Sequence, residues 1–196
     1  MKAATGGFIA GIIYFAAIPT YSLMLSLNIR TAILADAAVI TTLSVTTFTE
    51  TFAHCNSAAD MAMYLSTEMN PAKLERELDD NSNTFFIASV DGKDIGFAKV
   101  RNSLAPPELE HTHALEIERL YVLRDYHSMK AGAALMTRCL AFAREHNYNT
   151  VWLGVWEHNH KAIAFYDRWG FSAFGSHIFM LGIDEQTDVL MSKEIE

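Results

Sequence analysis

One stretch of the sequence, residues 120 to 135, limits the fold more than any other. A predicted strand ends at Leu123, a short loop follows, and a helix begins among small residues. The first N–H groups of a helix have no partner inside it and attract an anion, and small residues let that anion approach the backbone. The stretch therefore indicates either a diphosphate site or an ordinary helix with an alanine-rich first turn.

The elements on either side predict an α/β chain with a mixed sheet. Alternating apolar residues predict strands at 28–32, 84–90, 95–100, 114–123, 150–156, 171–181 and 188–193. Helices are predicted to start at Asp36, Ser57 and Pro71, and to cover 130–146 and 159–169. Asp91-Gly92 is typical of a tight hairpin, so its two strands should be antiparallel. We expect one domain over residues 27–196, preceded by an apolar extension over residues 1–26.

The extension has no charged residue between Lys2 and Arg30, and residues 6–27 are mostly apolar. That is long enough to cross a bilayer, which takes about 20 residues. Three explanations stay open: a membrane anchor, a cleaved signal peptide, or a start codon placed upstream of a true start at Met24. We expect a cytoplasmic protein or, with an anchor, one that faces the cytoplasm and touches the membrane only through residues 6–27.

Composition excludes several classes of site and partner. A formal net charge of -8 argues against nucleic acid as the main partner and would favour cationic molecules. Cys55 and Cys139 form no paired motif, so neither a disulfide framework nor a zinc ribbon is expected, and Cys139 fits a small buried side chain. Histidine pairs occur at 111/113 and 158/160, but no acidic or thiolate partner has matching spacing. We predict no metal site.

Residues 127–132 resemble the acetyl-CoA-binding motif of the GNAT superfamily, Gln/Arg-x-x-Gly-x-Gly/Ala. His127 stands at the first position, Lys130 at the first glycine and Gly132 at the second. Lys130 is the main departure from the motif. If that position needs a positive φ, a residue other than glycine costs about 1–2 kcal/mol there. Its charge could offset the cost by pairing with a phosphate.

A second segment, Asn159 to Phe171, is similar to the family pattern N-x-x-A-I-x-x-Y-x-x-x-G-F. The resemblance implies that Asn159 contacts the cofactor arm and that Tyr166 lies beside the thioester sulfur. From the residues alone, Asn159 is equally a helix N-cap and Tyr166 a core aromatic residue. The likeness covers residues 29–195 and implies the GNAT fold: α/β, with a mixed, mostly antiparallel central sheet that has a splayed strand pair and is flanked by helices.

The same resemblance implies an N-acetyltransferase that moves the acetyl group of acetyl-CoA to a primary amine. The implied acetyl-CoA-binding residues lie on the strand, the loop and the two helices. They are Leu120, Tyr121, Val122, His127, Ser128, Met129, Lys130, Ala131, Gly132, Ala133, Asn159 and Tyr166.

The reaction needs a base, because an amine with a lysine-like pKa of ~10.4 costs roughly 4.6 kcal/mol to deprotonate at neutral pH. Glu116 and Glu118 are the candidates, and each could equally be a solvated or salt-bridged strand residue. Alternation predicts that they share a face with Leu120 and Val122 and that Arg119 faces the other side. We expect Tyr166 to donate a hydrogen bond to the leaving sulfur, because a phenol near pKa 10 is a weaker acid than a thiol near 8.5.

A narrower likeness lies in the tail from His177 to Asp188 and in residues 115–119, which resemble PaiA-type polyamine acetyltransferases. It implies a polyamine or another small cationic amine as acceptor. Asp184, Glu185 and Asp188 would then line a cation-binding cleft, or simply solvate the last turn. The alternatives are a protein or peptide N-acetyltransferase, and a catalytically weak acyl-CoA-binding module tethered to a membrane. The oligomeric state stays open between a monomer and a homodimer.

Overall fold

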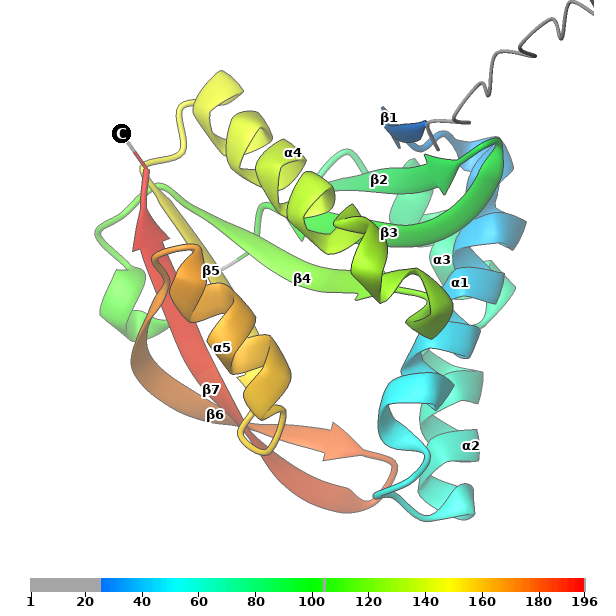
Figure 1. The fold of residues 1–196 in the computed structure, drawn as a ribbon. Helices are drawn as coiled ribbons and strands as arrows, with labels where there is room; N and C mark the ends of the chain where they lie inside the picture. Colours follow the sequence, from blue (N-terminus) through cyan, green and yellow to red (C-terminus); the bar gives the residue numbers. More distant parts are fainter. Residues whose placement is uncertain (1–25, 104, 196) are drawn as a thin grey trace, which may run out of the picture.

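The computed structural model describes residues 26–103 and 105–195, which form one twisted sheet with helices on both faces (Figure 1). The strands are β1 (Leu27–Thr31), β2 (Asn83–Val90), β3 (Lys93–Arg101), β4 (Ala114–Val122), β5 (Thr150–Trp156), β6 (Ser172–Leu181) and β7 (Asp184–Glu194). The helices are α1 (Ala37–Phe52), α2 (Ala58–Glu68), α3 (Pro71–Asp79), α4 (Ala131–Glu145) and α5 (His160–Arg168). The strand order is β1-β2-β3-β4-β5-β7-β6, and of these neighbours β4 and β5 run parallel while the others are antiparallel. The predicted mixed sheet is confirmed.

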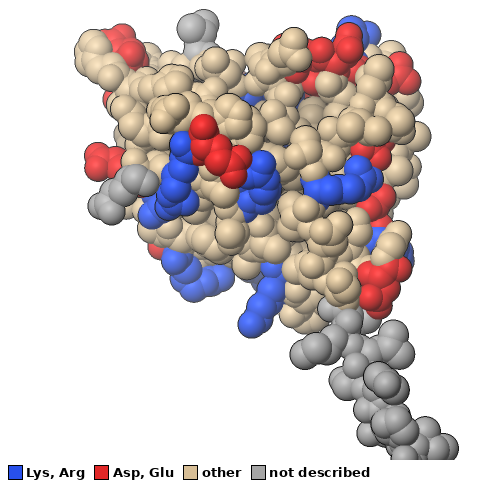
Figure 2. Space-filling view, turned by 90° about the horizontal axis from the view of Figure 1, so that it is seen from above, with Lys and Arg blue, Asp and Glu red and all other residues tan. Residues whose placement is uncertain are grey.

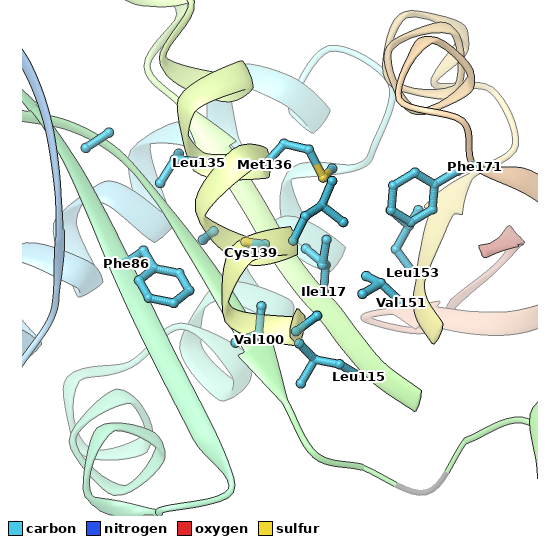
Figure 3. Close-up of a cluster of buried hydrophobic side chains, with 14 of the residues drawn as sticks. Phe86, Val100, Leu115, Ile117, Leu135, Met136, Cys139, Val151, Leu153 and Phe171 are labelled. Atoms are coloured by element: carbon cyan, nitrogen blue, oxygen red, sulfur yellow. The ribbon is translucent and has the colours of Figure 1, made fainter. Parts of the chain in front are cut away.

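The two faces of the sheet carry separate cores. On the face covered by α4 and α5, here the α4 face, Phe86, Leu115 and Leu153 pack around Leu135 and Cys139 of α4 (Figure 3). On the opposite face, here the α1 face, α1 and α3 pack on β2 and β3 through a second cluster. That cluster contains Ile40, Leu43, Leu74, Phe85, Ile87 and Phe97. Each such fully buried side chain stabilises the fold by about 1.5–3 kcal/mol relative to exposure.

The helix starts follow the predicted signals, with one difference in how they work. Ser57 caps α2 by accepting a hydrogen bond from the N–H of Asp60 at 3.1 Å, and Asn70 caps α3 in the same way. Asp36 precedes α1, but its carboxylate bonds backward to Arg30 at 2.7 and 2.8 Å and to the N–H of Ile33. The Asp36 carboxylate is therefore bound by Arg30 of the preceding strand and does not cap the N-terminus of α1.

The last strand is longer than predicted. β7 begins at Asp184 rather than at Asp188, directly after a turn in which Gly182 has a φ of 66°. Asp184 and Glu185 pair with Leu181 and Met180 of β6 although their own side chains are exposed. The prediction relied on apolar alternation, which these polar residues lack. Asp184 and Glu185 nevertheless belong to the strand, because their backbone pairs with that of β6.

The parallel pair at the centre of the sheet is splayed. β4 and β5 pair only where residues 114–116 meet residues 150–152, and beyond that point they diverge (Figure 1). From there β4 stays with β3 as far as Val122, while β5 stays with β7 as far as Trp156. The opening between the diverging halves of β4 and β5 is the predicted splay.

A β-bulge in β4 overturns the predicted arrangement of its side chains. Lys99 pairs with Arg119 but Val100 pairs with Ile117, so Glu118 is one extra residue. Ile117 and Leu120 therefore both face α4, although they are three positions apart. The prediction that Glu116 and Glu118 share a face with Leu120 and Val122, and that Arg119 faces away from them, is wrong. All three charged residues lie on the α1 face, because a bulge breaks the two-residue alternation.

Two further predictions concern the apolar N-terminal extension and the charge of the surface. The apolar extension falls almost wholly on residues 1–25, which lie outside the described residues. Among the helices in the described part of the chain, none is long and apolar enough to cross a membrane. On the face seen in Figure 2, basic and acidic side chains are interspersed among uncharged surface, and some of opposite charge lie directly against each other.

Candidate active site

The loop after β4 ends in a left-handed residue that sets up the start of α4. A 3-10 turn covers Arg124–Met129, and Lys130 then adopts φ 59° and ψ 16°. The first-glycine position of the motif thus has a positive φ, so Lys130 carries a backbone cost that glycine would avoid. The first bond of α4 runs from the N–H of Ala134 to the Lys130 carbonyl at 3.0 Å. The N–H groups of residues 131–133 precede that bond and are oriented to meet an anion.

Hydrogen bonds fix the first four residues of the loop, 124–127. The N–H of Arg124 donates to the Glu50 carboxylate on α1 at 2.9 Å, and the N–H of Tyr126 donates to the Leu123 carbonyl. His127, at the Gln/Arg position of the motif, places Nε2 2.9 Å from the Val122 carbonyl oxygen. The Lys130 side chain is exposed beside the helix start. The substituted motif therefore still forms an ordered turn against the end of β4.

Gly132 faces the space between α4, β4 and α5. A Cβ there would lie 4.0 Å from Leu120, Val122 and Phe165, which is ordinary van der Waals contact. Internal packing therefore does not require a glycine at this position. The lack of a side chain instead leaves room along the backbone, on the side where β4 leaves β5. These residues fit an extended chain with a diphosphate, as acetyl-CoA requires.

The second motif forms the start and core face of α5. Asn159 caps the helix by accepting a hydrogen bond from the N–H of Ala162 at 3.2 Å. The Tyr166 ring packs into the core with its centroid 5.4 Å from that of Phe165 and 6.0 Å from that of Phe171. Burial raises the pKa of Tyr166 well above its ordinary value of 10.0, with smaller contributions from Tyr121 and Cys139. The phenol therefore stays protonated and able to donate a hydrogen bond.

Glu116 and Glu118 lie in a network of ion pairs on the α1 face. Glu116 accepts from Arg101 Nε at 2.5 Å and from Ser103 Oγ at 2.6 Å. Glu118 lies 2.7 Å from Lys99 Nζ, 3.1 Å from Arg101 and 3.2 Å from Arg119. Both carboxylates are therefore committed to cations of β3 and β4.

A third carboxylate completes this network, which we call the charge network. Glu77 of α3 lies 3.0 Å from Lys99 and 2.7 Å from Arg119, and the Lys99 side chain is only 3% exposed. Burial alone would raise the pKa of Glu118, but Arg119, Lys99 and Arg101 outweigh it and the pKa lies below its ordinary value. A carboxylate held in this way is a weaker proton acceptor. These contacts support the alternative that Glu116 and Glu118 are salt-bridged strand residues. A role for either as the general base stays a prediction.

An aromatic cluster that no sequence motif indicates bridges the splay on the α1 face. Tyr121 of β4 and Trp156 of β5 belong to it together with Phe48, Tyr64 and Phe179. The Phe48 and Tyr64 rings stack with centroids 4.6 Å apart, and Tyr121 meets Phe48 edge-on at 6.4 Å. The members come from five separate elements, so no local motif announces them.

The cluster continues into an acidic cavity at the end of β5. This cavity has a volume of about 220 Å³. Its lining consists of Cys55, Trp156, Glu157, His158, Asp184, Glu185, Gln186 and Thr187. Asp184 and Glu185 thus line a cleft as one of the two predictions had it, whereas Asp188 is not part of the lining. Within the described residues no group of three or more histidine, cysteine or acidic side chains could hold a metal ion.

Known proteins share both the sequence pattern and this architecture. Residues 46–171 match the acetyltransferase (GNAT) family. An uncharacterised N-acetyltransferase of Lactobacillus delbrueckii subsp. lactis is 37% identical over 149 residues, which cover 76% of this chain and 86% of the relative.

Two solved structures show the same fold. PaiA N-acetyltransferase from Thermoplasma acidophilum, in complex with coenzyme A, superposes with a TM-score of 0.73 at 20% identity, over 87% of this chain and 99% of that one. The Salmonella typhimurium protein yncA, solved with acetyl-CoA, gives a TM-score of 0.67 at 16% identity, over 87% and 95% of the two chains. The family match and the bacterial relative show that the chain belongs to the GNAT family and is an acetyl-CoA-dependent N-acetyltransferase.

Proposed function

We propose that this enzyme acetylates a small cationic primary amine, of which a polyamine is the best-fitting class. The acidic cavity carries the proposal: its lining has three carboxylates, those of Glu157, Asp184 and Glu185, and among the described residues it includes no lysine or arginine. Trp156 adds an aromatic surface, and cations are attracted to both kinds of group. A volume of about 220 Å³ suits a small amine rather than a folded partner.

The cavity is connected to the splay through one side chain. Trp156 belongs both to the cavity lining and to the aromatic cluster that reaches Tyr121 on the other side of the opening. An amine with a distal cation in the cavity would therefore extend its reactive end along aromatic surface toward β4. A diamine or polyamine has the two cationic ends that this arrangement needs.

Acetyl-CoA would approach from the α4 face as the second substrate. We assign its diphosphate to the N–H groups of Ala131, Gly132 and Ala133 and to the ammonium of Lys130. The arm would run along residues 120–122, with the loop residues His127, Ser128 and Met129 shaping its entrance. Asn159 and Tyr166 would lie near the thioester, where a phenol kept protonated by burial can donate to the leaving sulfur.

The proposal is tested with the full-length chain, acetyl-CoA and a panel of acceptors: spermidine, putrescine and a peptide with a free N-terminus. Free thiol release measures turnover, and mass spectrometry identifies the acetylated product. We expect turnover with spermidine. Asp184→Asn combined with Glu185→Gln should raise the KM for spermidine about tenfold, a loss of about 1.4 kcal/mol, and leave the KM for acetyl-CoA unchanged.

Glu145→Gln is the matched control for that variant. Glu145 is a carboxylate of α4 paired with Arg138, and it does not line the cavity. Turnover with the peptide alone would replace the polyamine by a protein or peptide acceptor. Acetyl-CoA binding without turnover of any amine would instead identify an acyl-CoA-binding module. We place the enzyme in the cytoplasm, where acetyl-CoA is supplied.

A further inference from the structure

A histidine and an aspartate face each other beside the splay, outside the charge network. His177 of β6 and Asp188 of β7 are cross-strand partners, and His177 Nε2 lies 3.4 Å from Asp188 Oδ2. The aspartate side chain is 16% exposed, whereas the histidine side chain is 46% exposed. A largely buried carboxylate thus holds one edge of an imidazole whose other edge reaches the surface.

Gly154 of β5 brings the backbone of a third strand against this pair. A Cβ at Gly154 would lie 3.2 Å from Asp188 Oδ2 and 3.5 Å from His177 Nε2. No side chain therefore separates the pair from β5, which explains a glycine in the middle of a strand. Gly154 lies beyond Trp152, the last residue of β5 that pairs with β4. The pair is consequently at the opening rather than under the paired end of the strands.

The same pair is electrostatically connected to the far side of the opening. Asp188 pairs in register with Trp156, which belongs to the aromatic cluster with Tyr121. Burial raises the pKa of Tyr121 to about 12, the charge of Arg119 opposes this rise, and the charges of Asp188 and Glu118 add to it. Asp188 therefore lies next to the aromatic cluster that reaches β4 across the splay, on the face from which we expect the acceptor amine.

The acceptor needs a proton-accepting group on this face, and the charge network does not offer a free one. Glu116 and Glu118 are both ion-paired with cations at 2.5–2.7 Å. With Nε2–H donating to Asp188, the Nδ1 lone pair of His177 is the unshared acceptor of the pair. Asp188 from β7 is the charged group that contacts His177. Glu108, from the 3-10 turn at Pro107–Leu109, comes within 3.5 Å of a Cβ built at Gly175 on the same strand.

We propose that His177, oriented by Asp188, accepts the proton of the acceptor ammonium. This inference rests on the proposed function, since it assigns the proton acceptor for that reaction. His177 is then a catalytic residue and Asp188 a positioning residue. Gly154 keeps β5 close enough for the pair to stand at the opening.

The step balances as follows. The substrate ammonium gives one proton to Nδ1 of His177 and becomes a neutral amine. The amine nitrogen forms a bond to the thioester carbonyl carbon, and the carbon–sulfur bond breaks with its electron pair on sulfur. A second proton leaves the nitrogen and ends on the sulfur, giving an acetamide and a free thiol. His177 then returns its proton to water.

The test compares His177→Gln with His111→Gln in the full-length chain, with acetyl-CoA and spermidine from pH 6 to 10. His111 is a matched control because it also meets a carboxylate, that of Glu110 at 3.3 Å, but its side chain is 91% exposed and it precedes the end of β4 that stays paired with β5. We expect His177→Gln to lower kcat about 100- to 1,000-fold, the usual scale for a lost general base. Acetyl-CoA affinity by calorimetry should not change, and the acid limb of the kcat/KM profile should disappear.

Two further variants separate proton transfer from structure. Asp188→Asn keeps the shape of the side chain and should lower kcat about 10- to 100-fold while retaining an acid limb. His177→Ala should recover part of its rate in buffer with added imidazole, whereas a purely structural defect would not respond. A wild-type enzyme that turns over spermidine together with a His177→Gln variant of unchanged kcat and acid limb would overturn the assignment alone. A wild type without turnover of any amine overturns the proposed function and this assignment with it.

Discussion

The two faces of β4 are built on different principles although they belong to one strand. Toward α4, the strand presents Leu120 and Val122 to Gly132 and to open space. What this face offers a ligand is therefore the shape of the backbone. Toward α1, it presents Glu116, Glu118 and Arg119 to the charge network. The side to which we assign acetyl-CoA therefore offers shape and unpaired N–H groups, whereas the other side carries fixed charges. Each prediction below changes one face and leaves the other intact.

The largest effect is expected from breaking the charge network at Lys99. Lys99→Met removes one of the two cations that Glu77 and Glu118 share, the other being Arg119, and removing one partner from a buried ion pair costs about 3–5 kcal/mol. Lys73→Met is the control, because Lys73 pairs with Glu68 where both side chains are about one third exposed, and we expect less than about 1 kcal/mol. Urea unfolding of both variants measures the difference. Equal losses would mean that the network contributes no more than a surface pair.

The second-largest effect is expected on the α4 face, where a change at Tyr166 should lower kcat rather than stability. Tyr166→Phe keeps the packing against Phe165 and Phe171 and removes only the hydroxyl. If the phenol donates to the leaving sulfur, kcat should fall about 10- to 1,000-fold, with little change in acetyl-CoA affinity because the bond strengthens in the transition state. Steady-state kinetics and calorimetry test this. An unchanged kcat under chemistry-limited conditions would make Tyr166 a packing residue.

The pH dependence of stability separates the two roles open to Glu118. Its folded-state pKa lies below the ordinary value of 4.5, so its ion pairs stabilise the fold above that pH and the stabilisation is lost as the pH falls through the folded pKa. Glu118→Gln should remove this part of the acid dependence in unfolding experiments. The acid limb of the rate profile should survive in Glu118→Gln and in Glu116→Gln. Loss of that limb in either variant would restore a carboxylate as base and contradict the assignment to His177.

The smallest effect is expected at Lys130, the left-handed residue before α4. Lys130→Gly relieves the positive φ and should stabilise the fold by up to about 1 kcal/mol, since glycine's entropy offsets part of the 1–2 kcal/mol relieved. If the ammonium meets the diphosphate, Lys130→Glu should weaken acetyl-CoA binding more than Lys130→Gly, and added salt should shrink the gap. Equal affinities for all three proteins would show that the backbone alone holds the anion.

The sequence predicts the α4 face far better than the α1 face, for a physical reason. The turn at Lys130, the cap at Asn159 and the core position of Tyr166 depend on neighbours within about one helical turn, so a short motif specifies them. The bulge at Glu118 and the contact of Glu77 with Arg119, 42 positions away, depend on strand register and on a helix that docks from elsewhere. Strict alternation consequently put Glu116 and Glu118 on the wrong face.

For His177 and Asp188, the sequence is more informative than for the charge network and less informative than for the α4 face. Both fall in a tail segment that resembles one acetyltransferase group, so the linear pattern points to them. Their contact depends on the register of the β6–β7 pair, in which His177 lies opposite Asp188, and on a glycine of a third strand. The pairing of β6 with β7 therefore brings the two side chains together, which the linear pattern does not predict.

The single extra residue in β4 also has a consequence for how such a gene can vary. Replacing side chains along β4 changes one face at a time, but deleting any one residue between Ile117 and Leu120 would restore strict alternation. Either the apolar residues before the bulge or those after it would then have to turn away from α4, exchanging places with charges. β4 can thus tolerate many changes of identity and hardly any change of length, so insertions and deletions should be confined to the loops that flank it.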